Sequence, residues 1–323
     1  MTIRLKSAHH VRFAVPDLEE TLRFCLDFGL VLAARDDDTV YLRGTGTDAY
    51  SFVATKGDAT QMLGFALKVD AEAELHRAVV EYGATPVHAL EGPGGGVAVT
   101  LRDPDGTPID LVYGIEKAEP LPLRDDLVIN TPHDRKRFAR RQVQPDWAPA
   151  QIIRLGHIGL FVTDIGRSAD WYRHTLGLLL SDGVVAGPNK AMVAGFFRMD
   201  QGDEWVDHHS IALFPGPAGG AQHLSFEVQD IEAQAIAHDF MVRQGWEALW
   251  GVGRHALGSH VFDIWWAPGA IRFETFSDTD LHDASKPPEL HEARPELTRW
   301  GGEMPMEYVH PKGTPGFVGG PPE

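Results

Sequence analysis

The 323-residue sequence has little of what marks a secreted, a membrane-spanning or a nucleic-acid-binding protein. Its single cysteine, Cys25, cannot form an internal disulfide, which favours a reduced, cytoplasmic setting. No stretch approaches the roughly 18 apolar residues of a membrane helix, and Met1 to Lys6 lack the apolar core of a signal peptide. Basic residues are also few: 29 lysines and arginines stand against 46 acidic residues, for a net charge of −17. We therefore expect no nucleic-acid partner and no membrane association.

What the sequence contains instead is an internal repeat. An apolar strand pattern begins at His10 and recurs at His157, and in both copies an aspartate turn, an amphipathic helix and a Gly-Leu pair follow. Two later strand patterns match as well, namely Gln61–Leu67 with Gln222–Val228 and Pro108–Val112 with Arg272–Phe276. A repeat of this length has to be recognised before a fold is assigned. It predicts two domains of similar plan, for which the chain is long enough.

Each copy combines short strands of period-two patterning with two helices. The strands predicted in the first copy are Ala8–Val15, Val31–Arg35, Thr39–Arg43, Ala49–Thr55, Leu63–Val69, Val97–Arg102 and Pro108–Tyr113, and the helices are Leu18–Asp27 and Ala71–Tyr82. This order predicts an α+β fold, in which paired βαβββ modules form a curved, barrel-like mixed sheet in each domain.

The two copies differ in three equivalent residues. These are His10, Met62 and Asp110 in the first copy and His157, His223 and Glu274 in the second. Strand alternation directs the second set to one sheet face, where a carboxylate is costly unless it is paired or bound to a metal. Two histidines and one carboxylate are the ligand set of non-haem Fe(II) oxygenases, whereas Met62 is a poor ligand for a hard cation. We expect a metal in the second copy and none in the first.

The chain is accordingly divided into four parts. They are an N-terminal domain without metal (1–118), a linker rich in proline, arginine and aspartate (119–150), a catalytic metal-binding domain (151–282) and an irregular tail rich in proline and glycine (283–323). The tail either is a disordered end or packs over the second domain or a neighbouring subunit.

On these residues the sequence resembles the vicinal oxygen chelate superfamily and, within it, the two-domain type I extradiol catechol dioxygenases. The resemblance covers about residues 5–280. It rests on the strand that begins at His157 and on the segments His209–Leu213, His223–Phe226, Gly253–Ser259 and Phe273–Phe276. It implies two tandem domains of that fold and Fe(II), less often Mn(II), bound by His157, His223 and Glu274. It also implies a catechol-type substrate, O₂ and a homo-oligomer (dimer, tetramer or larger).

The same resemblance implies roles for two further histidines. His209 matches the acid–base catalyst beside the O₂ position, and His255 matches a histidine that hydrogen-bonds the catecholate oxygen. His208 precedes the first of these directly. On a strand it faces the other way, and we interpret it as a structural or solvated residue.

The sequence departs from the family at one substrate-binding position. The family usually has a tyrosine ten residues before the glutamate ligand, where it hydrogen-bonds substrate, and this chain has Ile264 there. Isoleucine offers no polar atom. His260, Asp263 and Trp265 are the side chains nearby that could take over its role.

Three functions fit these patterns to different degrees. The leading hypothesis is an extradiol dioxygenase that inserts both atoms of O₂ into a catechol-type substrate. The alternative is a metal-dependent lyase or isomerase of the glyoxalase type, which usually needs a fourth protein ligand and a catalytic carboxylate. A protein that sequesters an aromatic or metallated ligand would not need three ligands on one open face, with a nearby acid–base histidine.

Overall fold

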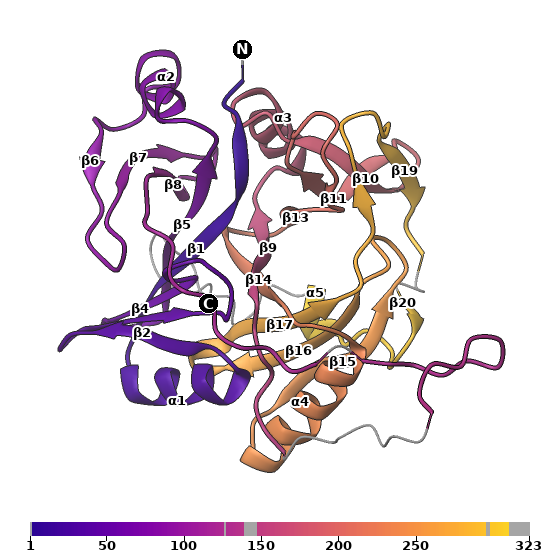
Figure 1. Ribbon diagram of the computed structural model, residues 1–323. Coiled ribbons are helices and arrows are strands. Elements are labelled where there is room, and N and C mark those ends of the chain that lie inside the picture. Colours follow the sequence, from indigo (N-terminus) through magenta and orange to yellow (C-terminus); the bar gives the residue numbers. More distant parts are fainter. Residues whose placement is uncertain (1, 126, 139–146, 295–297, 310–323) are drawn as a thin grey trace.

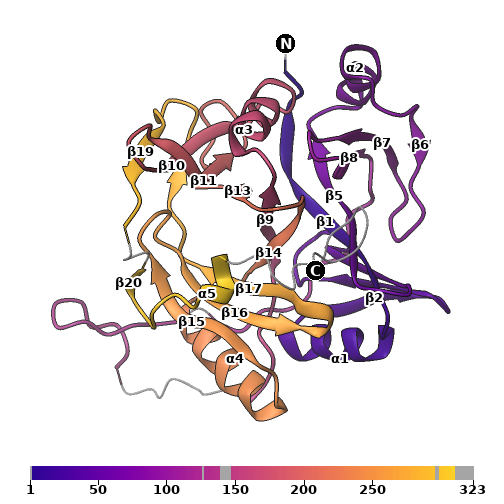
Figure 2. The same ribbon diagram turned by 180° about the vertical axis from the view of Figure 1, so that it is seen from behind.

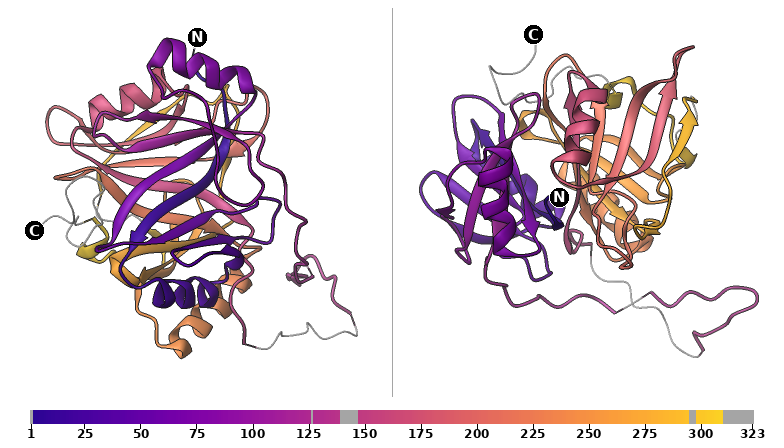
Figure 3. Two further views of the ribbon diagram at one scale, coloured as in Figure 1. Left: turned by 90° about the vertical axis from the view of Figure 1, so that its left-hand side faces the viewer. Right: turned by 90° about the horizontal axis from the view of Figure 1, so that it is seen from above.

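Two curved sheets stand side by side in the computed structural model, which describes residues 2–125, 127–138, 147–294 and 298–309 (Figures 1 and 3). The first sheet has the strand order β2-β3-β4-β1-β5-β8-β7-β6. Its strands are β1 (Leu5–Val15), β2 (Val31–Arg35), β3 (Thr39–Arg43), β4 (Phe52–Lys56), β5 (Gln61–Val69), β6 (His88–Ala89), β7 (Val97–Arg102) and β8 (Pro108–Tyr113). Helices α1 (Leu18–Phe28) and α2 (Glu72–Tyr82) complete two βαβββ modules.

The second sheet repeats this plan, with one tail strand added at each edge. Its order is β19-β10-β11-β13-β9-β14-β17-β16-β15-β20. Its strands are β9 (Arg154–Val162), β10 (Leu179–Ala186), β11 (Ala191–Arg198), β13 (Ile211–Pro215), β14 (Gly220–Glu227), β15 (Ala248–His255), β16 (Val261–Ala267), β17 (Ile271–Ser277), β19 (Glu289–Glu292) and β20 (Thr298–Trp300). The helical elements are α3 (Ile165–His174), α4 (Ile231–Gln244) and the short turn η1 (Pro268–Ala270). A separate pair joins β12 (Val206–Asp207) to β18 (Leu281–His282).

The predicted α+β fold of paired modules is confirmed, and the sheets curve without closing. Four first-domain strands have the predicted bounds, whereas the strand predicted from Ala49 begins three residues later, at Phe52. The division into residues 1–118, 119–150, 151–282 and 283–323 stays a prediction.

The repeated helices begin in the same way because each has an aspartate cap. Asp17 accepts a hydrogen bond from the backbone of Glu20, and Asp164 accepts one from that of Arg167, with N···O distances of 2.8 and 3.0 Å. Such caps satisfy a backbone N–H that the first helical turn leaves unpaired. At the other end of α1, Gly29 has a φ of 114°, which suits a residue without a side chain. The repeat in sequence is therefore a repeat in local structure.

One apolar core runs between the two sheets. Phe24 and Phe28 of α1 pack edge-on against Phe273 of β17, with both ring centroids 5.3 Å from that of Phe273. Cys25 is fully buried in the same core, and burial raises the pKa of its thiol, in agreement with a packing role. Among the described residues, no helix has both the length and the apolar character needed to span a membrane.

The described part of the tail packs over the second sheet. It adds β19 in parallel to β10 at one edge of the sheet and β20 antiparallel to β15 at the other (Figure 1). The short helix α5 (Met306–Val309) then lies over the strands near β16 and β17 (Figure 2). Of the alternatives for the tail, packing over the second domain holds for residues 283–294 and 298–309; the rest of the tail lies outside the described residues.

Candidate metal centre

Strand register brings the three predicted ligands together. His157 lies on β9, His223 on β14 and Glu274 on β17, and β14 pairs with both other strands. Ser225 is opposite His157 on one side and opposite Glu274 on the other, and His223 precedes it by two residues on the same face. The Nε2 atoms of the two histidines are 3.0 Å apart. Glu274 Oε1 lies 3.2 Å from His157 Nε2 and 4.0 Å from His223 Nε2.

These distances suit a metal ion. Adjacent ligands of an octahedral ion at ~2.1 Å lie about 3 Å from one another. The three donor atoms face each other, and a shared proton would satisfy only two of them, whereas a cation satisfies all three. Glu274 Oε2 is buried and has no hydrogen-bond partner, which is costly for a carboxylate in the absence of a cation. His157, His223 and Glu274 thus fit a divalent ion with open coordination positions.

Residues behind the ligands orient them. Gln222 Oε1 accepts a hydrogen bond from Nδ1 of His223, which leaves Nε2 of that ring for the ion. Ser225 donates to Glu274 Oε1 over 2.5 Å. Gly159 stands opposite His223, and a Cβ there would lie 2.3 Å from its Nδ1. The ligand ring therefore occupies the space that a side chain at position 159 would need.

Three more histidines surround the ligand set. The ring of His209 lies over that of His157, with 4.1 Å between centroids. On the other side, His255 Nε2 is 3.8 Å from Glu274 Oε2 and His260 Nε2 is 3.7 Å from Oε1. The rings of His209 and His260 are only 5.6 Å apart, because the sheet curves. The structure thus brings all the predicted polar site residues into one cluster.

The charge state of the cluster suits metal binding. Burial lowers the pKa of His223 to about 3, although the charge of Glu274 opposes this shift. Burial also lowers the pKa values of His209 and His260. For Glu274, burial raises the pKa, but the nearby His223, His157 and His255 outweigh it and hold the pKa well below its usual range. At neutral pH the centre therefore offers a neutral imidazole at His223 and a carboxylate at Glu274, the forms that ligate metals.

Ile264 lies beside the centre, as the sequence predicts, but it contributes only an apolar surface. It pairs with Glu274 across β16 and β17 and packs with Trp250, Phe262 and Tyr308. Of the three side chains considered as substitutes, His260 lies at the centre. Asp263 and Trp265 do not: Asp263 accepts hydrogen bonds from Trp265 Nε1, at 2.7 Å, and from His238 Nδ1, at 3.0 Å, away from the ligands.

Tyr308 is a site residue that sequence reasoning missed. It comes from α5, is 6% exposed, and its ring centroid lies 6.2 Å from that of His223 and 4.9 Å from that of Trp250. Gln222 Nε2 donates to its backbone oxygen over 2.8 Å. Only the irregular composition of the tail and its scattered aromatic residues hinted at this contact.

The expectation that His208 faces away from His209 is wrong. Neither residue lies in a regular strand, so strand alternation does not apply to them. Their Nδ1 atoms are 2.9 Å apart, and both rings are buried. His208 also bonds to Asp182, so it is buried and hydrogen-bonded and not solvated.

The first sheet has a different arrangement at the equivalent place. In the strand pairing, His10 lies opposite Ala66, and His157 lies opposite Ser225, so Ala66 is the equivalent of Ser225. Two residues before each of these stand Gly64 and His223. The equivalent of His223 is therefore Gly64 and not Met62. The predicted match was therefore two residues out of register. Gly64 has no side chain that could ligate a metal, and the expectation of no metal in the first domain stays a prediction.

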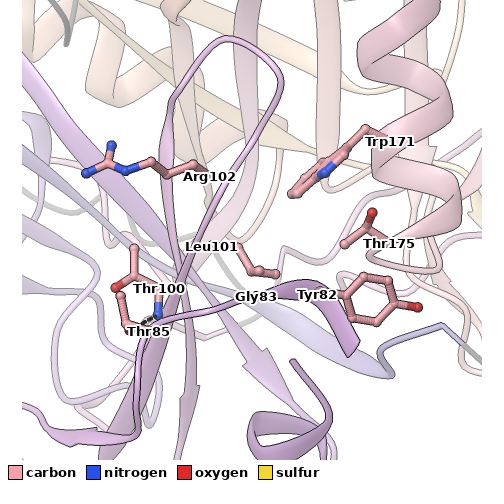
Figure 4. Close-up of a pocket in the computed structure, with 8 residues that line it drawn as sticks. All are labelled: Tyr82, Gly83, Thr85, Thr100, Leu101, Arg102, Trp171 and Thr175. Atoms are coloured by element: carbon pink, nitrogen blue, oxygen red, sulfur yellow. Dashed lines mark hydrogen bonds between the residues drawn. The ribbon is translucent and has the colours of Figure 1, made fainter. Parts of the chain in front are cut away.

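A surface cleft lies away from this centre. It has a volume of about 450 Å³ and is lined by residues of α2, β7 and α3, among them Tyr82, Arg102 and Trp171 (Figure 4). None of the residues of the metal centre lines it, and its lining holds no carboxylate, histidine or cysteine. We assign it no function.

Comparison with known proteins finds a family match for the residues of the second sheet. Residues 154–282 match the Glyoxalase/Bleomycin resistance protein/Dioxygenase superfamily. This match and the two curated relatives described below show a likeness to the type I extradiol dioxygenases. The chain is 29% identical to metapyrocatechase 2 of Cupriavidus necator over 94% of the chain and 91% of that protein.

Two further proteins extend the comparison. The manganese-dependent 2,3-dihydroxybiphenyl 1,2-dioxygenase of Geobacillus genomosp. 3 is 24% identical, over 94% of the chain and 96% of that protein. The Mn(II)-bound glyoxalase of Novosphingobium aromaticivorans has the same fold, with a TM-score of 0.79, 21% identity and 98% coverage of both chains. Of the two expected ions, Fe(II) and Mn(II), the names of these two relatives give Mn(II).

Proposed function

We propose that the protein is an extradiol dioxygenase that opens a catechol-type ring with both atoms of O₂, at a metal held by His157, His223 and Glu274. The observation that carries this proposal is the convergence of their donor atoms, 3.0 to 4.0 Å apart, inside a ring of further histidines. The names of the curated relatives, a metapyrocatechase and a dihydroxybiphenyl dioxygenase, support the same reaction class.

Side chains on the two sides of the ligand set have different roles in the proposed reaction. When bound, the ion would supply open positions for two vicinal substrate oxygens and O₂, together with Lewis acidity. His209, on the β13 side, is neutral because burial lowers its pKa, so it can take a proton from a substrate hydroxyl and return it later. His255 and His260, on the β15 and β16 side, are placed to donate hydrogen bonds to substrate oxygen.

The walls of the centre favour an aromatic substrate. Phe196 contacts His209, with 5.1 Å between ring centroids, and Phe276 contacts His157 at 5.3 Å. Trp250 lies 5.3 Å from His255, and Tyr308 closes the tail side. Flat aromatic walls contact a flat ring over a large area. Burial among them also keeps water from competing with the substrate for the ion.

The ion itself is proposed as Fe(II), with Mn(II) as the second choice, because both accept two imidazoles and one carboxylate. We further propose a homo-oligomer, to be measured as the mass of the metal-loaded protein by light scattering. A mass of 35.5 kDa, that of one chain, would contradict this second point.

The proposed reaction is tested by anaerobic loading with Fe(II) or with Mn(II), followed by oxygen-electrode and absorbance assays on a panel of catechols. We expect O₂ uptake and a yellow ring-fission product, both abolished by His223→Ala. His10→Ala, which changes the equivalent of His157 in the first sheet, is the matched control and leaves turnover unchanged. Metal binding without O₂ uptake on any catechol would overturn the proposal.

The second candidate is a lyase or isomerase of the glyoxalase type, which the name of one structural relative favours. That chemistry usually needs an additional carboxylate. In the two donor groups that the described residues form at this centre, Glu274 is the one carboxylate. The O₂ assay separates the two candidates, because an isomerase consumes no O₂.

A further inference from the structure

Behind the metal centre lies a row of polar side chains to which the proposed function gives no role. Asp182, on β10, accepts a hydrogen bond from His208, with 2.6 Å between Oδ2 and Nε2. Nδ1 of His208 lies 2.9 Å from Nδ1 of His209. All three residues are buried. The row therefore links a carboxylate outside the metal centre to the histidine proposed as the acid–base group.

The tail holds the outer end of this row. β19 pairs in parallel with β10, and this register places His291 beside the start of the row. His291 Nε2 lies 2.8 Å from the other carboxylate oxygen, Oδ1 of Asp182. Both oxygens of Asp182 are thus engaged by imidazoles, and the carboxylate is fixed in one orientation. The described tail consequently orders a group connected to the site.

Hydrogen-bond complementarity fixes the position of each proton along the row. Burial raises the pKa of Asp182, but the hydrogen bonds of His208 and His291 prevail and lower it to about 2, so the carboxylate only accepts. With one proton on each imidazole of the row, His208 carries its proton on Nε2, facing Asp182, and its lone pair on Nδ1. It follows that Nδ1 of His209 donates to His208, and the lone pair of His209 is on Nε2.

We propose that Asp182 is a positioning residue that acts through His208 to hold His209 in the tautomer whose Nε2 can accept a proton. The opposite tautomer would carry a proton on Nε2 and could not act as a base there. Among the described residues, Nε2 of His209 has no hydrogen-bond partner, so the row alone selects the tautomer. The inference rests on the proposed function for the role of His209 as acid–base group.

The kinetic test uses Asp182→Asn in the metal-loaded protein. The amide leaves one accepting oxygen for two imidazole donors. Its NH₂ group can donate to Nε2 of His208, and this reverses the tautomers of His208 and of His209. Since a positioned acid–base group contributes about 10²–10⁴-fold in rate, we expect kcat to fall by about that factor, with the KM for catechol little changed. Asp182→Glu, which keeps the carboxylate, restores part of the rate. His291→Gln, which leaves the bond to His208 in place, is the matched control and has a small effect.

A spectroscopic readout tests the same point without turnover. In protein loaded with diamagnetic Zn(II) and labelled with ¹⁵N-histidine, the resonances of His209 are assigned through a His209→Gln variant. We expect Nε2 of His209 to be unprotonated in the parent chain and protonated in Asp182→Asn. If the latter variant does not fold, His208→Leu, which removes the acceptor for Nδ1 of His209, is measured in its place with the same expectation.

The two proposals fail in different ways. A parent chain that cleaves no catechol but shows the tautomer change contradicts the proposed reaction and supports the positioning by Asp182. A parent chain that cleaves catechol while Asp182→Asn retains both its kcat and the tautomer of His209 overturns the positioning role. A loss of kcat without a tautomer change also overturns it, because Asp182 would then act in some other way.

Discussion

Arg12 and Asp110 form an ion pair in the first sheet at the place where the second sheet gathers its proposed metal ligands. Arg12 Nη2 lies 2.7 Å from Asp110 Oδ2. Register makes Asp110 the equivalent of Glu274 and Arg12 the equivalent of Gly159. In one sheet a glycine on β9 leaves room for a histidine on β14. In the first sheet Gly64 on β5 stands opposite Arg12 on β1, and the guanidinium of Arg12 brings positive charge to the carboxylate of Asp110.

The ion pair can be tested by a double-mutant cycle on stability. Arg12→Met leaves Asp110, which is 6% exposed, with only Thr100 as a hydrogen-bond donor. We expect a loss of about 1–3 kcal/mol in the free energy of unfolding, the range for a hydrogen bond to a charged group. Asp110→Asn on top of Arg12→Met should cost less than the sum of the single changes. Additive costs in urea unfolding would show that the pair does not interact.

The fit between Gly159 and His223 predicts the outcome of a single added methyl group. Gly159→Ala would place Cβ 2.3 Å from Nδ1 of His223, so the ligand ring must move. We expect the metal content after loading to fall from one ion per chain to a small fraction of that. Gly166→Ala is the matched control, because a Cβ there meets only Asp164 Oδ1 at 3.5 Å. Full metal content in Gly159→Ala, by elemental analysis, would refute the placement of this ring.

Gln222 should set metal affinity through the orientation of His223. Gln222→Leu keeps the approximate size of the side chain but removes the oxygen that accepts from Nδ1 of His223. Loss of such an outer partner typically costs 10–100-fold in metal affinity, and we expect an effect of about that size in competition with a chelator. Gln222→Glu retains an accepting oxygen and should bind more tightly than Gln222→Leu. Equal affinities for the two variants would contradict the role of the acceptor.

Buried histidines of the first sheet predict a loss of stability in acid. Burial lowers the pKa of His9 to about 4 and that of His10 well below its usual range. Because the unfolded chain binds protons near pH 6.5 and the folded chain does not, this stability is complete above pH 6.5. It is lost as the pH falls towards 4, and His9 alone accounts for about 3 kcal/mol of it.

The measurement is urea unfolding of the metal-free protein between pH 7 and pH 4.5. The double variant His9→Gln/His10→Gln should show a shallower fall in stability than the parent chain. His88→Gln, at an exposed histidine, should leave the slope unchanged. An unchanged slope in the double variant would mean that these two rings do not titrate in the folded state as their burial implies.

The sequence sufficed for the fold, and it pointed to three residues whose donor atoms the structure brings together, because period-two patterns and residue types carry both. It was not sufficient for the register: a shift of two residues preserves the alternation, so Met62 and Gly64 fit the pattern equally well. Only the strand pairing separates them. Asp182, Gln222 and Tyr308 were missed because their roles depend on contacts across the curved sheet or with the tail, which no local pattern contains.

The central claim is that His157, His223 and Glu274 form the site at which both atoms of O₂ enter a catechol-type substrate. The most direct measurement is mass spectrometry of the product formed under ¹⁸O₂ by the metal-loaded protein. We predict a ring-opened product that carries two labelled oxygen atoms at short reaction times, and none in His223→Ala. A product with one labelled atom, or one formed without uptake of label, would contradict the claim.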